Sequence, residues 1–287
     1  GISGCERSMI DGKYHIQSIN LDNNNLSWTL AASIYTLPNL SQLYIKDNPN
    51  LDVDIDDLTQ SIYASNYTDI NISNNIIYGD ITNFSNLTNL AYLDVSCNTS
   101  TNLDNCTATG NISFVPSLPN LYAVLVWGHR DVIFDLSYLS DTPQITQIYA
   151  LDNYIVGNID VLADNTGMTR LDLGCWNLLD GQCDVSGNMS TLTNMTNLNS
   201  VSFDGLLNIE WDIGVLFDKY NLQYVDLSHN LWLTGTLGTG VGNLSWMIDF
   251  DIDDTSVGWA LPIEMYTWIN IQDLNIHNNN LEGPLLE

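Results

Sequence analysis

The sequence predicts a solenoid, a fold in which short coils of similar sequence stack on one another. Three observations support this prediction: a repeated spacing of apolar residues, the distance between its copies, and an asparagine at a fixed place in many copies. The stretch "SNLTNLAYLDVSCN" (85–98) shows the pattern, because Leu90, Leu93 and Val95 are followed by Asn98. Leu93 and Val95 alternate with polar residues, as in a short half-buried strand, and no helical face has this spacing.

The same spacing recurs along nearly the whole chain. Its copies begin at Ile16, Leu40, Tyr67, Leu90, Leu121, Ile145, Met168, Leu198, Leu222, Met247 and Ile271. Successive start points are 24, 27, 23, 31, 24, 23, 30, 24, 25 and 24 residues apart. One coil has too few apolar residues to bury alone, so stacked neighbours must share a core. We therefore expect residues 1–287 to form a single solenoid of about eleven repeats.

The repeat resembles the pattern LxxLxLxxN of the leucine-rich-repeat family. The segments "NLWLTGTLGTGVGNL" from Asn230, "NYIVGNI" from Asn153 and "NNLEGPL" from Asn279 are similar to its plant-type extracellular subclass. This resemblance implies an α/β-type solenoid, a right-handed superhelix with a parallel β-sheet on the concave side and irregular or 3₁₀ structure on the convex side. It also implies that residues 1–15 are the remnant of an N-terminal cap-like segment.

The cysteines predict two local disulfide bonds. Each of the two longest repeats holds a pair, Cys97 and Cys106 in one and Cys175 and Cys183 in the other. Each pair brackets an insertion, near 97–111 and 175–190, and local disulfides of this kind imply an oxidising compartment. The histidines do not complete a recognisable zinc pattern with these cysteines.

Cys5 has no assigned partner. In the family that the chain resembles, a cysteine at this place bonds to an earlier one, so either the natural N-terminus lies upstream or Cys5 pairs with another chain. We also expect neither end of the solenoid to be capped. At a head-to-tail junction, Ile271 and the next chain's Ile16 would be 32 residue steps apart, close to the length of the longest internal repeats. Such a contact need not close into a ring and would propagate as a fibre.

The net charge of −28, from six Lys and Arg against 34 Asp and Glu, argues against nucleic acid and anionic membranes as partners. The acidity serves either the solubility of a secreted protein or the binding of cations and basic partners. No run of 18 apolar residues is present, so we expect no membrane insertion.

Asparagine-linked glycosylation motifs are frequent, which favours secretion, although Asn-rich repeats also generate such motifs by themselves. We expect glycans on exposed motifs, and we expect Asn98 to be bare because its amide would bond to the backbone. Asn71 lies on the sheet, where a glycan would obstruct the concave face. The candidate sites are Asn25, Asn39, Asn66, Asn71, Asn83, Asn86, Asn105, Asn111, Asn188, Asn194 and Asn243.

The outward strand positions predict a binding surface rather than an active site. No nucleophile–base motif, phosphate loop or HExxH motif is present, so we expect no enzyme activity and no cofactor. Aromatic rings between acids could hold a sugar or a basic peptide, or the rings could simply pair across strands. The candidate residues are Tyr44, Tyr92, Trp127, Tyr149, Tyr224, Asp226, Asp249, Asp251, Asp253 and Asp273.

A calcium site at Asp249, Asp251 and Asp253 is a weaker hypothesis, because no loop fixes the ligand geometry. Two functions agree with these observations. The first is a secreted, N-glycosylated structural glycoprotein that binds copies of itself head to tail in an extracellular fibre or matrix. The alternative is the ligand-recognition ectodomain of a larger receptor or adhesion protein, with an extracellular protein, peptide or carbohydrate as its partner.

Overall fold

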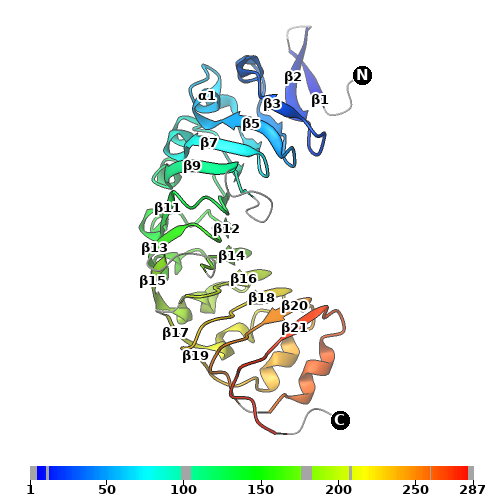
Figure 1. Cartoon of the computed structure of the whole chain (residues 1–287), viewed down its shortest axis with the longest axis vertical. Helices are drawn as coiled ribbons and strands as arrows, with labels where there is room; N and C mark the ends of the chain where they lie inside the picture. Colours follow the sequence, from blue (N-terminus) through cyan, green and yellow to red (C-terminus); the bar gives the residue numbers. More distant parts are fainter. Residues whose placement is uncertain are drawn as a thin grey trace. The chain divides into compact units, whose positions relative to one another are not determined.

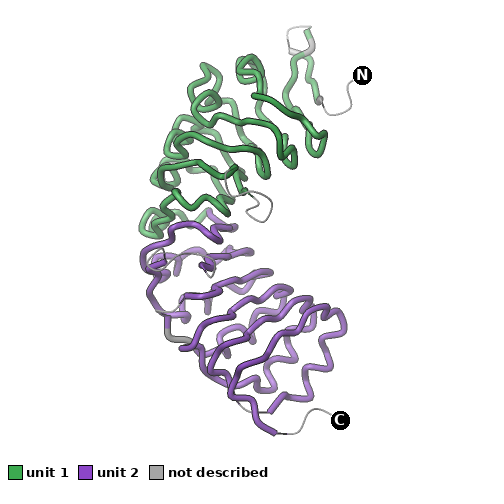
Figure 2. The backbone as a smooth tube through the Cα atoms, in the orientation of Figure 1, with its two compact units in different colours: residues 1–144 green, residues 145–287 purple. Residues whose placement is uncertain are grey.

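The structure is a computed structural model that describes residues 5–10, 13–97, 105–175, 183–206, 209–258 and 260–283. The chain forms two compact units, residues 1–144 (unit 1) and 145–287 (unit 2) (Figure 2). Each unit is a stack of coils that contributes strands to two sheets, called sheet 1 and sheet 2 below (Figure 1).

Unit 1 alternates between its two sheets along the chain. Its sheet 1 has the order β1 (Cys5–Ile10), β2 (Lys13–Asn20), β4 (Gln42–Tyr44), β6 (Asp69–Asn71), β8 (Tyr92–Asp94) and β10 (Ala123–Leu125). Its sheet 2 contains β3 (Ser27–Thr29), β5 (Asn50–Asp54), β7 (Ile76–Asp80), β9 (Cys106–Asn111) and β11 (Val132–Asp135). Its helices are η1 (Ala32–Thr36), α1 (Ile55–Thr59), η2 (Ala64–Asn66), η3 (Ile81–Asn86), η5 (Val115–Ser117) and η6 (Leu136–Leu139).

Unit 2 repeats this arrangement. Its sheet 1 has the order β12 (Gln147–Tyr149), β14 (Arg170–Asp172), β16 (Ser200–Ser202), β18 (Tyr224–Asp226), β20 (Asp249–Asp251) and β21 (Asp273–Asn275). Its sheet 2 contains β13 (Tyr154–Asn158), β15 (Cys183–Asn188), β17 (Ile209–Asp212) and β19 (Leu233–Thr234). Its helices are η7 (Ile159–Leu162), η8 (Met189–Asn194), η9 (Ile213–Leu216), η10 (Thr239–Asn243) and η11 (Ile263–Thr267).

The repeated apolar residues form the core, as the spacing predicts. Leu90, Leu93 and Val95 are fully buried. Leu93 pairs in parallel register with Ile70 on one side and Val124 on the other, so equivalent residues of successive coils stack in columns. Side chains alternate along a strand, so the residues between the buried ones form the outer face of sheet 1.

Asparagines at the end of the repeat pattern tie each coil to the preceding one. The buried Asn75 donates through Nδ2 to the carbonyl oxygen of Ile45 in the preceding coil, at 3.0 Å, and to that of Ile72 in its own coil, at 2.7 Å. His129 occupies the equivalent place in its coil, and its Nε2–H donates to the carbonyl oxygen of Val95 at 2.7 Å. These bonds satisfy buried backbone carbonyls that turn away from the sheet. Asn98, which we expect at the same place, lies outside the described residues.

Sheet 2 was not expected from the sequence, which predicted irregular or 3₁₀ structure on the convex side. The 3₁₀ helices are present, but parallel strands precede many of them. A recurrent glycine allows the chain to pass from strand to helix: Gly110 has φ +97°, and a Cβ there would lie 2.1 Å from Asp80 Oδ1. That Oδ1 caps η3 by accepting from the backbone N–H of Thr82 at 2.9 Å. Glycine is therefore required by both conformation and space.

The beginning of unit 1 corrects a second expectation. β1 pairs antiparallel with β2 and covers the edge of sheet 1, so that edge is capped. A strand of another chain cannot pair with β2 there without displacing β1, which argues against the proposed junction. At the far side of unit 2, β21 leaves Leu274 45% exposed.

Candidate functional site

The residues expected to form a binding surface lie on or directly after sheet 1 strands. In unit 1, Tyr92 packs against Tyr122 with ring centroids 6.1 Å apart. This pair agrees with the alternative that the aromatic rings pair across adjacent strands and stabilise them. Tyr44 ends β4, and Trp127 follows β10. In unit 2 the expected residues are distributed along successive strands: Tyr149, Tyr224, Asp226, Asp249, Asp251, Asp253 and Asp273.

The outer face of sheet 1 in unit 2 contains an open groove with a volume of about 360 Å³. Four of the expected residues line it: Tyr149, Tyr224, Asp226 and Asp249. Its remaining lining includes Leu151, Arg170, Asp172, Asn199, Ser200, Val201, Ser202 and Val225. The structure thus brings part of the predicted surface together around one groove.

Arg170 is held in place at one side of the groove. Its guanidinium carbon lies 3.9 Å from the centre of the Tyr149 ring, and its Nε pairs with Asp172 Oδ2. Asp172 is 2% exposed, and its other oxygen accepts from Ser200 Oγ at 2.9 Å. Burial raises the pKa of Asp172, whereas Arg170 opposes that shift. Asp172 therefore neutralises Arg170, while Tyr149 supports it as a rigid platform.

The opposite side of the groove is acidic. Neither Asp226 nor Asp249 forms an ion pair within the described part of the chain. Burial raises the pKa of Asp226, and hydrogen bonds from Ser228 oppose this. The pKa of Asp249 is also raised, first by burial and then by the neighbouring carboxylate of Asp273. Tyr224 pairs with Asp249 across strands β18 and β20; it is 43% exposed and offers an apolar face to a ligand.

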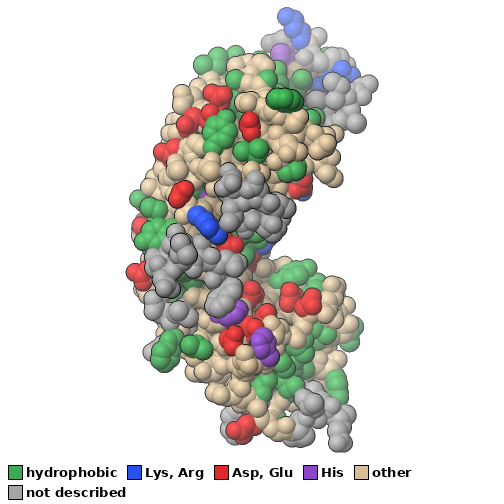
Figure 3. All heavy atoms as spheres, in the orientation of Figure 1, with side chains coloured by type: hydrophobic (Ala, Val, Ile, Leu, Met, Phe, Trp, Pro, Cys, Tyr) green, Lys and Arg blue, Asp and Glu red, His purple; other side chains and the backbone are tan. Residues whose placement is uncertain are grey.

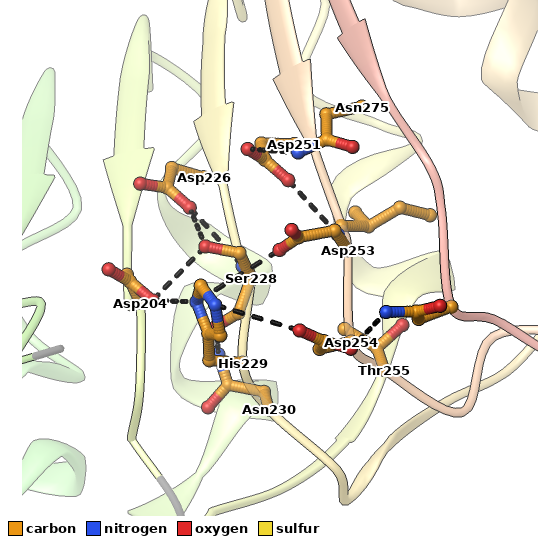
Figure 4. A network of polar contacts seen from close by, with 12 residues as sticks. Asp204, Asp226, Ser228, His229, Asn230, Asp251, Asp253, Asp254, Thr255 and Asn275 are labelled. Atoms are coloured by element: carbon orange, nitrogen blue, oxygen red, sulfur yellow. Dashed lines mark hydrogen bonds and ion pairs between the residues drawn. The ribbon is translucent and has the colours of Figure 1, made fainter.

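A second group of polar residues lies beside the groove, and of its members only Asp253 was predicted from the sequence. The Asp–His cluster consists of Asp204, His229, Asp253 and Asp254, which are labelled in Figure 4, together with His277. Figure 3 shows histidine side chains beside acidic ones in unit 2. These residues follow four successive strands of sheet 1. Each lies either two or three residues after the end of its strand. Alignment of the repeats by those positions would have revealed the cluster.

The calcium hypothesis named a different set. Asp251 uses Oδ1 to accept from the backbone N–H of Asp253 at 3.0 Å and Oδ2 to accept from Asn275 Nδ2 at 3.0 Å. Among the described residues, the only converging group of potential metal ligands is His229, Asp253 and Asp254. Asp249 and Asp251 are outside it, so the structure does not assemble the expected triad.

The cysteine pairs form the expected local disulfides. Cys97 is bonded to Cys106 at the start of β9, and Cys175 to Cys183 at the start of β15. Residues 98–104 and 176–182, within the two insertions, and the side chain of Cys5 lie outside the described part of the structure.

The candidate glycosylation sites differ in accessibility. Asn71 is 8% exposed; its Nδ2 donates to Asp94 Oδ2 at 3.1 Å, and its Oδ1 accepts from Ser73 Oγ at 2.7 Å. A glycan at Asn71 would break these bonds, so the structure argues against this site. The other candidate sites are at least partly exposed: Asn25, Asn39, Asn66, Asn83, Asn86, Asn105, Asn111, Asn188, Asn194 and Asn243.

None of the helices in the described ranges combines the length and apolar character needed to cross a membrane. No protein-family model and no curated protein sequence matches the chain.

Solved structures do resemble it. The ectodomain of the Arabidopsis receptor kinase HAESA, in complex with an extended IDA peptide hormone, is similar with a TM-score of 0.72 at 19% identity over 94% of this chain and 43% of that one. PEPR1 in complex with AtPEP1 gives a TM-score of 0.65 at 19% identity over 90% and 34%. A plant ice-binding protein gives 0.71 at 18% identity over 99% and 88%.

The chain thus spans less than half the length of the two receptor ectodomains. At these identities the similarity establishes architecture. Together with the repeat register, the asparagine positions and the two sheets, it shows that the chain has the plant-type leucine-rich-repeat fold.

Proposed function

We propose that the chain is a ligand-recognition domain of the extracellular leucine-rich-repeat type, and that its ligand is an extended peptide with basic side chains. The observation that carries this proposal is the groove on sheet 1 of unit 2. It combines exposed aromatic area at Tyr224 with two carboxylates, Asp226 and Asp249, that have no ion-pair partner in the described structure.

The charge of the groove favours a cationic ligand. Its Arg170 is already paired with Asp172, so Asp226 and Asp249 determine the remaining charge. Burial is the main cause of the raised pKa of Asp249, and repulsion from the neighbouring carboxylates of Asp273 and Asp226 raises it further. A lysine or arginine of a ligand would relieve this repulsion, and the net charge of −28 would attract such a ligand from a distance.

Other observations agree with recognition outside the cell. Two disulfides are typical of an oxidising compartment. HAESA and PEPR1 are described in complexes with a peptide hormone and with AtPEP1, respectively. We therefore favour a binding domain over an enzyme and over a head-to-tail fibre, since β1 occupies the edge that the fibre junction would need.

An array of synthetic peptides of equal length, sorted by charge, tests the proposal. The purified chain should bind peptides rich in Lys or Arg, and binding should weaken with added salt because partly exposed charges are screened. Asp226→Asn together with Asp249→Asn should reduce affinity about tenfold, a loss of about 1.4 kcal/mol. Asp184→Asn is the matched control, because Asp184 is exposed on β15 of sheet 2 in the same unit. Preference for acidic peptides, or equal losses in both variants, would reject the proposal.

A further inference from the structure

Three side chains beside the groove converge from two successive coils. One nitrogen of His229 and one carboxylate oxygen each of Asp253 and Asp254 lie within 4.8 Å of one another. His229 Nε2 lies 3.7 Å from Asp254 Oδ2, and Asp253 Oδ1 lies 4.0 Å from the other ring nitrogen, Nδ1. Two ligands of one tetrahedral Zn²⁺ stand roughly 3.4 Å apart, so shifts of about 1 Å would bring this group into coordination range.

The carboxylate of Asp253 indicates that these three side chains bind a ligand. Its side chain is 9% exposed, and within the described residues its Oδ1 is buried with no hydrogen-bond partner. That oxygen points toward the His229 ring (Figure 4). A buried carboxylate oxygen without a donor costs free energy, and a bound cation would remove this cost.

Asp204 orients the histidine for coordination. His229 Nδ1 lies 2.8 Å from Asp204 Oδ1, so Nδ1–H donates to this carboxylate. In the neutral imidazole the lone pair is then on Nε2, the nitrogen that faces Asp254. Ser228 Oγ also contacts Asp204 Oδ1, at 3.1 Å, and helps to hold it. A carboxylate behind a histidine ligand fixes its tautomer and increases its basicity, as in many zinc sites.

We propose that His229, Asp253 and Asp254 form a binding site for a divalent transition-metal ion of the Zn²⁺ class, oriented by Asp204. One imidazole with carboxylates suits Zn²⁺ better than Ca²⁺, which prefers six or more oxygen ligands. Water completes the set, because His277 Nδ1, 3.4 Å from Asp253 Oδ2, donates to Asn275 Oδ1 at 2.6 Å.

The bound ion would join adjacent coils of unit 2. His229 follows β18, and both aspartates follow β20, so the ion would add a link beside the backbone bonds between these strands. An ion that binds only the folded chain stabilises it in proportion to its concentration relative to Kd. The site does not depend on the proposed peptide ligand.

Calorimetric titration of the tag-free, chelator-treated chain with ZnCl₂ and with CaCl₂ tests the inference. We expect one Zn²⁺ per chain and much weaker binding of Ca²⁺. Asp254→Asn should weaken Zn²⁺ binding at least tenfold. This variant should fold, because Asp254 has φ +49° and asparagine tolerates that conformation.

Asp47→Asn is a closely matched control. Asp47 occupies the equivalent repeat position in unit 1, has φ +59°, and accepts from Asn74 Nδ2 at 2.7 Å just as Asp254 accepts from Asn278 Nδ2 at 2.8 Å. It should leave Zn²⁺ affinity unchanged, whereas His229→Ala should abolish binding with circular dichroism still native. Absence of Zn²⁺ binding, equal affinities in the two asparagine variants, or equal affinity for Ca²⁺ would overturn the inference.

Discussion

Replacement of His129 by asparagine should make unit 1 less sensitive to acid. His129 is fully buried at the place where other coils use asparagine, and burial lowers its pKa from 6.5 to about 4. A histidine with a lowered folded-state pKa stabilises the fold fully above its unfolded pKa, and this stability is lost as the pH falls through 6.5 toward 4. An asparagine does not titrate, and it can donate to Val95 as Asn75 donates to Ile45.

The expected size of the effect follows from the two pKa values. Between about pH 7 and about pH 5, a group with pKa 6.5 unfolded and about 4 folded loses roughly 2 kcal/mol of stabilisation. Urea denaturation followed by circular dichroism at both pH values measures this. On going from the higher to the lower pH, the unfolding free energy of wild type should fall by about that amount more than the unfolding free energy of His129→Asn. The buried carboxylates titrate in both proteins and cancel in the comparison. A difference independent of pH would refute the assignment of a neutral buried imidazole.

Three further changes probe the fold and its modification. Gly110→Ala should lower the free energy of unfolding by about 1–3 kcal/mol, because φ is +97° and the new Cβ would meet Asp80. Gly258→Ala should lower it less, because the nearest atom to its new Cβ is 3.5 Å away, and thermal denaturation compares the two variants. Replacement of Cys97 and Cys106 by serine should cost roughly 2–3 kcal/mol in the same assay, since the bond closes a loop with a sequence separation of 9, and an unchanged midpoint would speak against it. Glycopeptide mass spectrometry of the chain secreted from eukaryotic cells should find Asn71 bare and exposed Asn243 modified; the reverse would show that β6 is misplaced.

Much of the fold follows from the sequence because its determinants are local and periodic. Leu93 and Val95 identify a strand by alternation, and the stacking of coils follows because one coil cannot bury Leu90 alone. Sheet 2 was not predicted, although β5 alternates the buried Leu51 and Val53 with polar residues. The signal that predicts it is the recurrent glycine, of which Gly110 and Gly187 are examples with positive φ.

The site is less predictable because it depends on pairing between coils. Tyr224 and Asp226 were found from their strand positions, but nothing local indicates that Arg170 is neutralised by Asp172 or that Asp204 orients His229. The separation of 25 residues between Asp204 and His229 is one repeat of 24 residues plus one position, so their contact can be predicted only once the register is known. For the same reason, Asp249 and Asp251 resembled a calcium site in the linear sequence although their side chains do not join Asp253.

The central claim is that sheet 1 of unit 2 is the ligand-recognition surface. Photo-crosslinking tests it most directly, with a photoreactive amino acid placed at Tyr224 in the groove or, in a second protein, at exposed Ser186 on β15 of sheet 2. Each protein would be mixed with the Lys- and Arg-rich peptide that binds best on the array, and irradiated. We expect a crosslinked product at position 224, which unlabelled peptide should compete away, and none at position 186. Crosslinking at 186 without crosslinking at 224 would contradict it.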